Sequence, residues 1–251
     1  MEAGRGGVVQ RWDVVSDLRI VTRADAVERP FEAGALLVDK PPRITSFGVV
    51  KKVRWALGVK KVGHAGTLDP LATGLLILLV GREATRQQDR FMGLPKVYTG
   101  TLRLGQTTPS YDADTPVEAE ADAQHVTDAD LDAARLPLVG EIMQRPPVYS
   151  AIKKGGERLY KKARRGETVE IEARPTTVTA FDLVARRGDD VDFRVECSKG
   201  TYVRSLAHDL GQALGVGAHL VALRREAIGP FRVDEAFALD ALVEAARPEA
   251  A

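Results

Sequence analysis

One acidic residue, Asp69, lies where enzymes commonly place a reactive carboxylate. It belongs to the segment KVGHAGTLDP (61–70), and the apolar run LATGLLILLVG (71–81) follows it directly. The run predicts a buried strand over 75–80, so the acid is expected on a rigid loop at the end of a core element. Asp before Pro is also a common turn pair, because Asp bonds its own backbone and Pro presets φ. The spacing alone leaves both interpretations open.

Composition restricts the class of protein. The 251 residues are 44% hydrophobic and 28% charged, which suits a globular chain with a sizeable core. A single cysteine, Cys197, excludes an internal disulfide and a cysteine-based zinc cluster, and its alternating surroundings predict a buried strand thiol. The longest apolar run is too short to span a bilayer, and the polar N-terminus does not resemble a secretory signal. We therefore expect a protein of the reducing cytoplasm.

Charge is segregated along the chain although the net charge is only +1. Residues 51–61 hold five basic groups and no acid, residues 151–166 hold seven basic groups against one glutamate, and residues 112–132 hold eight acids and no base. Such a run is often a solvated helix face. Because each basic run also carries an aromatic residue (Trp55, Tyr160), both are candidates for contact with nucleic-acid phosphates.

Periodicity predicts the elements that must hold these groups. Apolar spacing and cap residues predict helices over 46–57, 127–136, 158–165, 201–214 and 240–246, with Ser46, Thr127 and Thr201 as N-caps. Strands are predicted over 35–39, 75–80, 97–104, 168–171, 176–184, 191–197, 218–228 and 231–233, and residues 111–126 as a surface loop. Strands and helices do not alternate strictly, which favours an α+β fold with a mixed sheet over a doubly wound fold.

Six segments, in order, carry a family resemblance. GHAGTLDPLATGLL closely resembles the active-site segment of the TruB family of pseudouridine synthases, which modify the T-loop uridine of tRNA. The other matching segments are LLVDKPPRITS (36–46), KVYTGTLRLGQTT (96–108), PPVYSAIKKGGERLYKKARRGE (146–167), CSKGTYVRSLAHDLGQALG (197–215) and HLVALRREAIGPF (219–231). The resemblance implies the pseudouridine synthase fold, a central mixed and mostly antiparallel sheet with flanking helices and a catalytic cleft. We expect an N-terminal extension over 1–34 and a catalytic domain over 35–251, without a C-terminal RNA-binding domain.

The resemblance also implies catalytic roles for three residues. Asp69 matches the nucleophile, and Arg204 matches the arginine that pairs with it and keeps it ionised. Tyr98 matches the active-site tyrosine, whose ring stacks on uracil and whose hydroxyl is a candidate relay for the C5 proton. Taken alone, Arg204 would be an exposed helix charge and Tyr98 a core strand residue.

Five further residues match substrate-binding or supporting positions of the family. Tyr202 and Leu223 match residues that line the uracil pocket, and His64 matches the histidine that contacts the flipped nucleotide. Lys40 matches a loop that packs against the catalytic loop. Asp112 matches an acid that supports the arginine, although the chain departs from the usual pattern at Pro109 and Thr115.

The implied reaction breaks the C1′–N1 bond of U55, rotates the base and joins C5 to C1′. It contains no redox step, so neither a cofactor nor a metal is expected. The expected partner is the T-arm of tRNA, bound by a monomer that needs no protein partner and no membrane. Two alternatives remain at this point: an N-glycosidase that releases free uracil, and a non-catalytic module that binds and folds tRNA.

Overall fold

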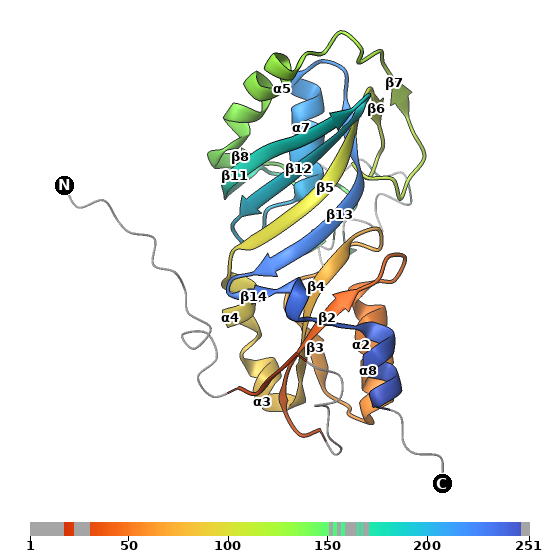
Figure 1. Ribbon diagram of the computed structural model, residues 1–251, viewed down its shortest axis with the longest axis vertical. Coiled ribbons are helices and arrows are strands. Elements are labelled where there is room, and N and C mark those ends of the chain that lie inside the picture. The colour runs from red at the N-terminus through yellow and green to blue at the C-terminus, as the bar shows by residue number, and fades with distance from the viewer. Residues whose placement is uncertain are drawn as a thin grey trace, which may run out of the picture. The chain divides into compact units, whose positions relative to one another are not determined.

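The computed structural model describes residues 18–22, 31–150, 153–154, 157–158, 165, 167 and 171–246. The chain divides into two compact units, each with its own core. Unit 1 comprises Met1–Lys96 and Arg224–Ala251, and unit 2 comprises Val97–Leu223. Figure 1 labels the larger elements of both units.

Unit 1 is built on two long, buried strands. Strand β2 (Gly34–Lys40) runs antiparallel to β4 (Thr73–Val80), with Leu37 opposite Ile77. Strands β1 (Ile20–Val21) and β15 (Phe237–Ala238) pair in parallel with β2, and β3 (Val62–His64) pairs antiparallel with β4. The end of β13 (Ala218–Ile228) pairs in parallel with the start of β4 through Arg224 and Arg225, and β14 (Phe231–Arg232) turns back along β13.

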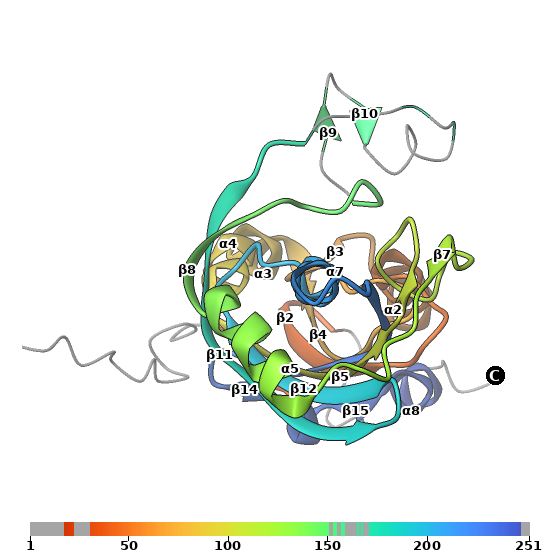
Figure 2. The same ribbon diagram turned by 90° about the horizontal axis from the view of Figure 1, so that it is seen from above.

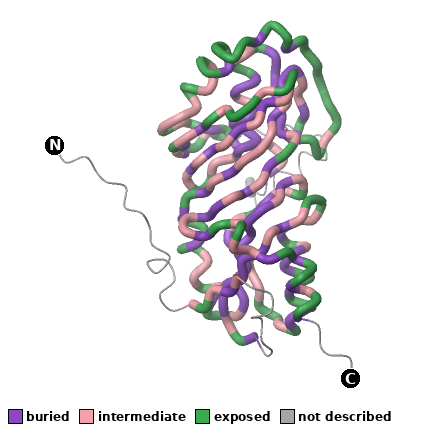
Figure 3. Tube along the Cα trace, in the orientation of Figure 1, coloured by how far each residue is buried: buried purple, intermediate pink, exposed green. Residues whose placement is uncertain are grey.

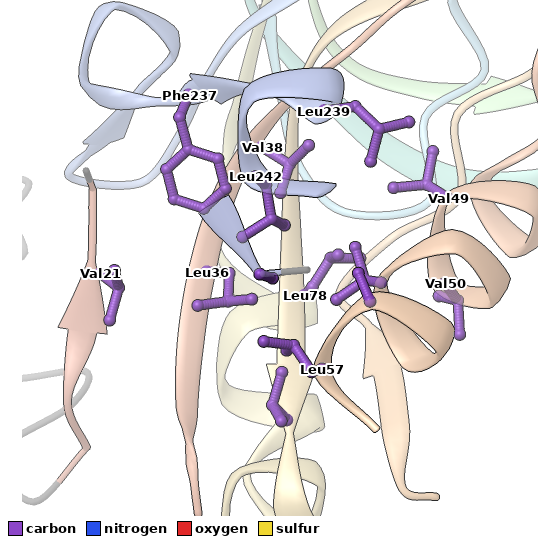
Figure 4. Packing of buried hydrophobic residues seen from close by; sticks show 14 of the residues in the cluster. Val21, Leu36, Val38, Val49, Val50, Leu57, Leu78, Phe237, Leu239 and Leu242 are labelled. Carbon is purple, nitrogen blue, oxygen red and sulfur yellow. The ribbon is translucent and has the colours of Figure 1, made fainter. Parts of the chain in front are cut away.

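Helices cover both faces of this sheet. Helices α2 (Ser46–Leu57) and α8 (Leu239–Ala245) pack on one face, where Leu36, Val38 and Leu78 meet the apolar side of α2 (Figure 4). Helices α3 (Gly81–Arg86) and α4 (Gln88–Gly93) accompany the second cluster, in which Phe91 lies beside Phe231. Each fully buried leucine contributes about 1.5–3 kcal/mol. Strand β4, which follows the Asp69 loop, is therefore firmly held.

Unit 2 is an antiparallel sheet with helices against it. The order of its strands is β13, β5 (Lys96–Leu104), β12 (Asp190–Cys197), β11 (Arg174–Arg187) and β8 (Gly140–Gln144). Strand β12 alternates between buried and half-buried residues, as Figure 3 shows, and Cys197 is buried at its end. Helix α7 (Val203–Ala213), seen nearly end-on in Figure 2, lies on one face of the curved sheet together with α5 (Asp128–Arg135). Smaller elements are β6 (Gln106–Thr107), β7 (Ala119–Glu120), β9 (Lys153–Lys154), β10 (Glu157–Arg158), and the 3-10 turns η2 (Leu136–Leu138) and η3 (Val233–Glu235).

Most predicted elements are present, but two predicted N-caps are wrong. Thr45, rather than Ser46, caps α2 by accepting from the Gly48 amide at 2.9 Å. Helix α7 begins after Tyr202, and the Thr201 hydroxyl instead donates to the carbonyl of Ser198 at 3.1 Å. The Ser46 hydroxyl bonds the carbonyl of Leu68, 22 positions later in the chain, whereas the Thr201 hydroxyl bonds a carbonyl three residues earlier.

Other differences concern short elements and segments that lie outside the described residues. Strands β3 and β8 and helices α3 and α4 were not predicted, and β7 lies inside the acidic stretch predicted as a loop. In the helix expected over 158–165, Arg158 belongs to β10 and residues 159–164 lie outside the described residues, as do 168–170 of the strand expected there. No helix in the part of the chain that the structure describes is long and apolar enough to cross a membrane.

Candidate active site

Asp69 lies half-buried on the loop between β3 and β4. Its carbonyl accepts from the Ala72 amide at 3.1 Å, which closes a turn through Pro70. At Gly74, directly after this turn, φ is 97° and an added Cβ would lie 2.4 Å from the carbonyl oxygen of Arg225. Only glycine permits that backbone conformation and that approach of β13. The turn that the Asp-Pro pair predicts is therefore real, and it holds the acid at the end of a buried strand.

Three buried side chains bind the backbone of this loop. The Lys40 ammonium donates to the carbonyls of Ile44 at 2.8 Å and Pro70 at 3.3 Å. The Ser46 hydroxyl bonds the backbone of Leu68, and the Arg225 guanidinium donates to the carbonyl of Gly66. Each of the three is at most 2% exposed. Buried donors of this kind are stable only when their hydrogen bonds are made, so they hold the loop as firmly as the loop holds them.

His64 lies in β3, five residues before the acid. Burial and the nearby Arg225 charge lower the pKa of its imidazole below the usual 6.5. Its carbonyl accepts from the Gln88 side chain at 3.0 Å, which ties β3 to α4. His64 is therefore a neutral side chain at pH 7, able to contact an apolar or stacked group without adding charge.

A basic pocket opens beside β3. Its volume is about 490 Å³, and it is lined by Lys60, Lys61, Val62, Gly63, Arg82, Thr85, Arg86 and Gln88. Four of these side chains are cationic, which suits a phosphate. Lys60 and Lys61 belong to the basic run noted in the sequence. Arg82 and Arg86 were missed because α3 was not predicted, although their spacing of four residues is that of one helix face.

In unit 2, Arg204 is held by the turn over 108–112. The guanidinium donates to the carbonyls of Ser110 at 2.7 Å and Tyr149 at 2.9 Å, and its Nε lies 3.5 Å from Asp112 Oδ2. Arg204 is 5% exposed and Asp112 is 2% exposed. The alternative of an exposed helix charge is therefore wrong, and the predicted support of Arg204 by Asp112 corresponds to a buried ion pair.

Tyr111 fixes the conformation of that turn. Its φ is 63°, a left-handed conformation that costs a residue other than glycine about 1–3 kcal/mol. Its ring stacks on His208 with the centroids 3.8 Å apart, and His208 lies one helical turn after Arg204 on α7. Its carbonyl accepts from the Leu220 amide at 3.0 Å. These contacts maintain the strained turn and thereby the place of Asp112.

The remaining predicted residues of unit 2 lie on its strands and at the start of α7. Tyr98 on β5 and Leu223 on β13 occupy neighbouring strands, and each is 9% exposed. Tyr202 directly precedes α7. The side-chain carboxamide of Gln144 accepts from the Tyr202 backbone amide at 2.7 Å and donates to the Tyr202 carbonyl at 3.1 Å. Gln144 was not predicted, because a buried carboxamide gives no periodic signal of its own.

The arrangement provides an acid on a rigid loop, a buried arginine oriented by a carboxylate, and a cationic pocket. Within unit 1 the structure brings Lys40 to the loop of Asp69, and within unit 2 it brings Asp112 to Arg204. Arg225 and Ser46 were missed. Arg225 could have been predicted from the sequence. It alternates with the apolar residues Leu223 and Ala227 on the buried side of β13, and a buried charge must have a structural partner.

Comparison with known sequences gives two family models. The one described as TruB family pseudouridylate synthase (N terminal domain) matches residues 54–203, and the one described as tRNA pseudouridylate synthase B C-terminal domain matches residues 204–250. A tRNA pseudouridine synthase B of Nocardia farcinica is 51% identical over 218 residues, covering 85% of this chain and 71% of the relative. A tRNA pseudouridine synthase B of Opitutus terrae is 49% identical over 216 residues, covering 86% of this chain and 89% of the relative.

Solved structures agree with this result. The chain matches one in a Cbf5-Nop10-Gar1 complex with a TM-score of 0.65 and 34% identity, and one in an H/ACA RNP bound to a substrate RNA containing 2'-deoxyuridine with a TM-score of 0.63 and 31% identity. Each match covers 84% of this chain but only 53% and 52% of the other, so this chain spans about half the length of those proteins. The family match over more than half of the chain, together with these relatives, shows that this chain belongs to the TruB family of tRNA pseudouridine synthases and has the α+β fold predicted for it.

Proposed function

We propose that this tRNA pseudouridine synthase acts on U55 of the T-loop and that Asp69 is its nucleophile. The observation that supports this proposal most directly is the geometry of the Asp69 loop. A half-buried carboxylate is carried by a backbone that buried donors bind on either side of it, at Leu68 and at Pro70. Such rigidity is required of a group that must attack one atom of a bound base.

The reaction rearranges one nucleotide without a net change in its atoms. The C1′–N1 bond breaks, the detached uracil rotates, C5 bonds to C1′, and the proton on C5 is transferred to N1 through acid and base groups. The Asp69 carboxylate initiates this sequence by addition to C6, by attack at C1′, or by removal of the C2′ proton. In each route the carboxylate must be ionised, and a cation favours that form. The family resemblance assigns this role to Arg204, and it assigns to Tyr98 the stacking on uracil and the relay of the C5 proton.

Access to the uridine requires that the nucleotide leave its stack. We assign His64 to the contact with the flipped nucleotide, and Tyr202 and Leu223 to the walls of the uracil pocket. The low pKa of His64 supports this assignment, because a neutral imidazole stacks on a base without the cost of burying a charge.

Affinity for tRNA is assigned in part to the basic pocket of unit 1. Lys60, Lys61, Arg82 and Arg86 line it, and each phosphate contact releases condensed counterions, so binding must weaken as salt increases. We further propose that the enzyme acts as a monomer on the T-arm without a protein partner, and that it works in the cytoplasm, where its tRNA substrate is found.

The experiment is to map pseudouridine in an unmodified tRNA transcript after incubation with wild-type protein and with Asp69→Asn. A chemical adduct that stops reverse transcription at pseudouridine gives the position. We expect one new stop at U55 with wild-type protein, no stop with Asp69→Asn, and no stop in a matched transcript that carries cytidine at position 55.

The competing functions give different results in the same experiment. Release of free uracil with an abasic site at position 55 would identify an N-glycosidase. A stop that persists in Asp69→Asn would remove Asp69 from the role of nucleophile. Tight, salt-sensitive tRNA binding without any stop would support a module that folds tRNA.

A further inference from the structure

Ser46 uses its hydroxyl in an unexpected way. It is the first residue of α2, but Thr45 caps that helix, so the Ser46 side chain is not needed at the helix end. Its Oγ instead accepts from the Leu68 amide at 2.8 Å and donates to the Leu68 carbonyl at 3.0 Å. The side chain is 2% exposed. One buried hydroxyl therefore binds both backbone groups of a single residue, 22 positions later in the chain.

The residue that Ser46 binds, Leu68, directly precedes Asp69, so the contact acts on the backbone next to the carboxylate. Arg225 donates to the carbonyl of Gly66, Ser46 to that of Leu68, and Lys40 to that of Pro70. Every second carbonyl of the loop is thus bound by a side chain from the scaffold. Leu68 is 3% exposed, whereas Asp69 between the bound residues is half-buried.

We propose that Ser46 is a positioning residue for the reaction, which sets the orientation of the Asp69 carboxylate by fixing the peptide groups of Leu68. The proposal rests on Asp69 being the nucleophile. A bond at the amide and a bond at the carbonyl of Leu68 together restrain the rotation of the backbone just before Asp69, which neither bond does alone. A nucleophile displaced by about 1 Å can lose about 100-fold in rate, even though the substrate is still bound.

A substitution of Ser46 tests the loop contacts with less disturbance of the core than a substitution of Lys40 or Arg225. Replacement of Lys40 or Arg225 removes a buried charge that bonds several carbonyls, and so disturbs the whole core. Ser46→Ala removes one oxygen atom. Ser46→Thr retains the hydroxyl and serves as the conservative variant. Thr101→Val serves as the control, because it likewise removes one hydroxyl, whose bond to Asp192 at 2.7 Å is partly buried and lies in unit 2.

The experiment measures single-turnover pseudouridine formation at saturating enzyme, tRNA affinity, and hydrogen exchange of the Leu68 amide, all well below the unfolding temperature. For Ser46→Ala we expect a rate about 10–100-fold lower, an affinity within twofold of wild type, and Leu68 exchange at least tenfold faster. Ser46→Thr should recover most of the rate. Thr101→Val should retain the wild-type rate even if its unfolding temperature falls as far as that of Ser46→Ala.

Outcomes that overturn the proposal are distinct from those that overturn the proposed function. A Ser46→Ala rate within twofold of wild type, with faster Leu68 exchange, shows that Ser46 does not position the nucleophile. An equal loss of rate in Thr101→Val shows a general effect of stability. If Ser46→Ala does not fold, Ser46→Cys, which retains a donor and an acceptor at the same position but weakens both bonds, must reduce the rate at least fivefold. Wild-type protein without activity, or an active Asp69→Asn, contradicts the proposed function itself.

Discussion

Arg225 binds the carbonyl of Gly66 at 3.1 Å while it also donates to the carbonyl of Leu75 at 2.7 Å. The two carbonyls lie on either side of the Asp69 turn, one before it and one at the start of the buried run of β4. A single guanidinium, 1% exposed, therefore spans the base of the loop. Its planar fork of donors suits this task, because it satisfies two acceptors in fixed directions.

The first prediction concerns the stability that Arg225 provides. Arg225→Leu removes the donor from two carbonyls in the protein interior, at about 1–3 kcal/mol each, so we expect the free energy of unfolding to fall by about 2–6 kcal/mol. Urea denaturation followed by circular dichroism measures the change. Arg225→Lys retains the charge but not the planar fork of donors, so its free energy of unfolding should lie between those of wild type and Arg225→Leu. A loss below 1 kcal/mol in Arg225→Leu would show that water or neighbouring donors replace the guanidinium.

The second prediction concerns the buried pair of Arg204 and Asp112. Removal of one member of a buried ion pair costs about 3–5 kcal/mol, and directly contacting groups couple by about 0.5–3 kcal/mol. A double-mutant cycle of Arg204→Gln and Asp112→Asn in urea denaturation should therefore give a coupling energy above 1 kcal/mol. The matched control is the cycle of Arg103 and Asp190, a bidentate pair with bonds of 2.7 and 2.9 Å that is far more exposed. Its coupling should stay below about 1 kcal/mol. Additive effects at Arg204 and Asp112 would contradict the pair.

The third prediction concerns the basic pocket. Arg82→Glu and Arg86→Glu should each weaken tRNA binding and lower the slope of log affinity against log salt by about one, without a change in the position modified. Filter binding at a series of salt concentrations, from about 50 to about 300 mM, measures the slope. Arg90→Glu makes the same charge change at an exposed site on α4 outside the pocket and should have a smaller effect. Equal effects at all three positions would indicate general electrostatic attraction rather than a phosphate site.

The fourth prediction concerns pH. Burial raises the pKa of Asp209, on α7, from 3.8 to about 6, although Arg145 acts in the opposite direction. The folded chain thus retains this proton up to about pH 6, whereas the unfolded chain releases it near pH 3.8. Between these values the folded state binds more protons, so the free energy of unfolding must fall as pH increases.

Asp209→Asn should remove this part of the pH dependence. Allowing for the partial exposure of Asp209, we expect the variant to gain about 1 kcal/mol over wild type at pH 7 and nothing at pH 4. Urea denaturation at a series of pH values gives both numbers. A variant less stable than wild type at pH 7 would show that the ionised carboxylate makes a favourable contact that outweighs its burial.

Regular elements with strong apolar patterns were predictable from the sequence. The continuous run over 75–80 became β4, and the alternation over 191–197 became β12, because side-chain burial on one or both faces imposes these periods. Helix α5 began where Thr127 predicted, with its complete capping box. The short helices α3 and α4 were missed, since six residues give too few turns for a periodic signal.

The sequence by itself determined the family and the α+β class, and it predicted which acid is the nucleophile, because these depend on local residue types in a fixed order. Within each unit, the tertiary structure decided which backbone carbonyls the buried side chains bind. Ser46 lies 22 positions from Leu68, Arg225 lies 159 positions from Gly66, and Arg204 lies 94 positions from Ser110. Local patterns could not reveal these contacts, since a hydroxyl or a guanidinium can bond any carbonyl within reach. Only the folded chain determines which carbonyls come within about 3 Å of each donor.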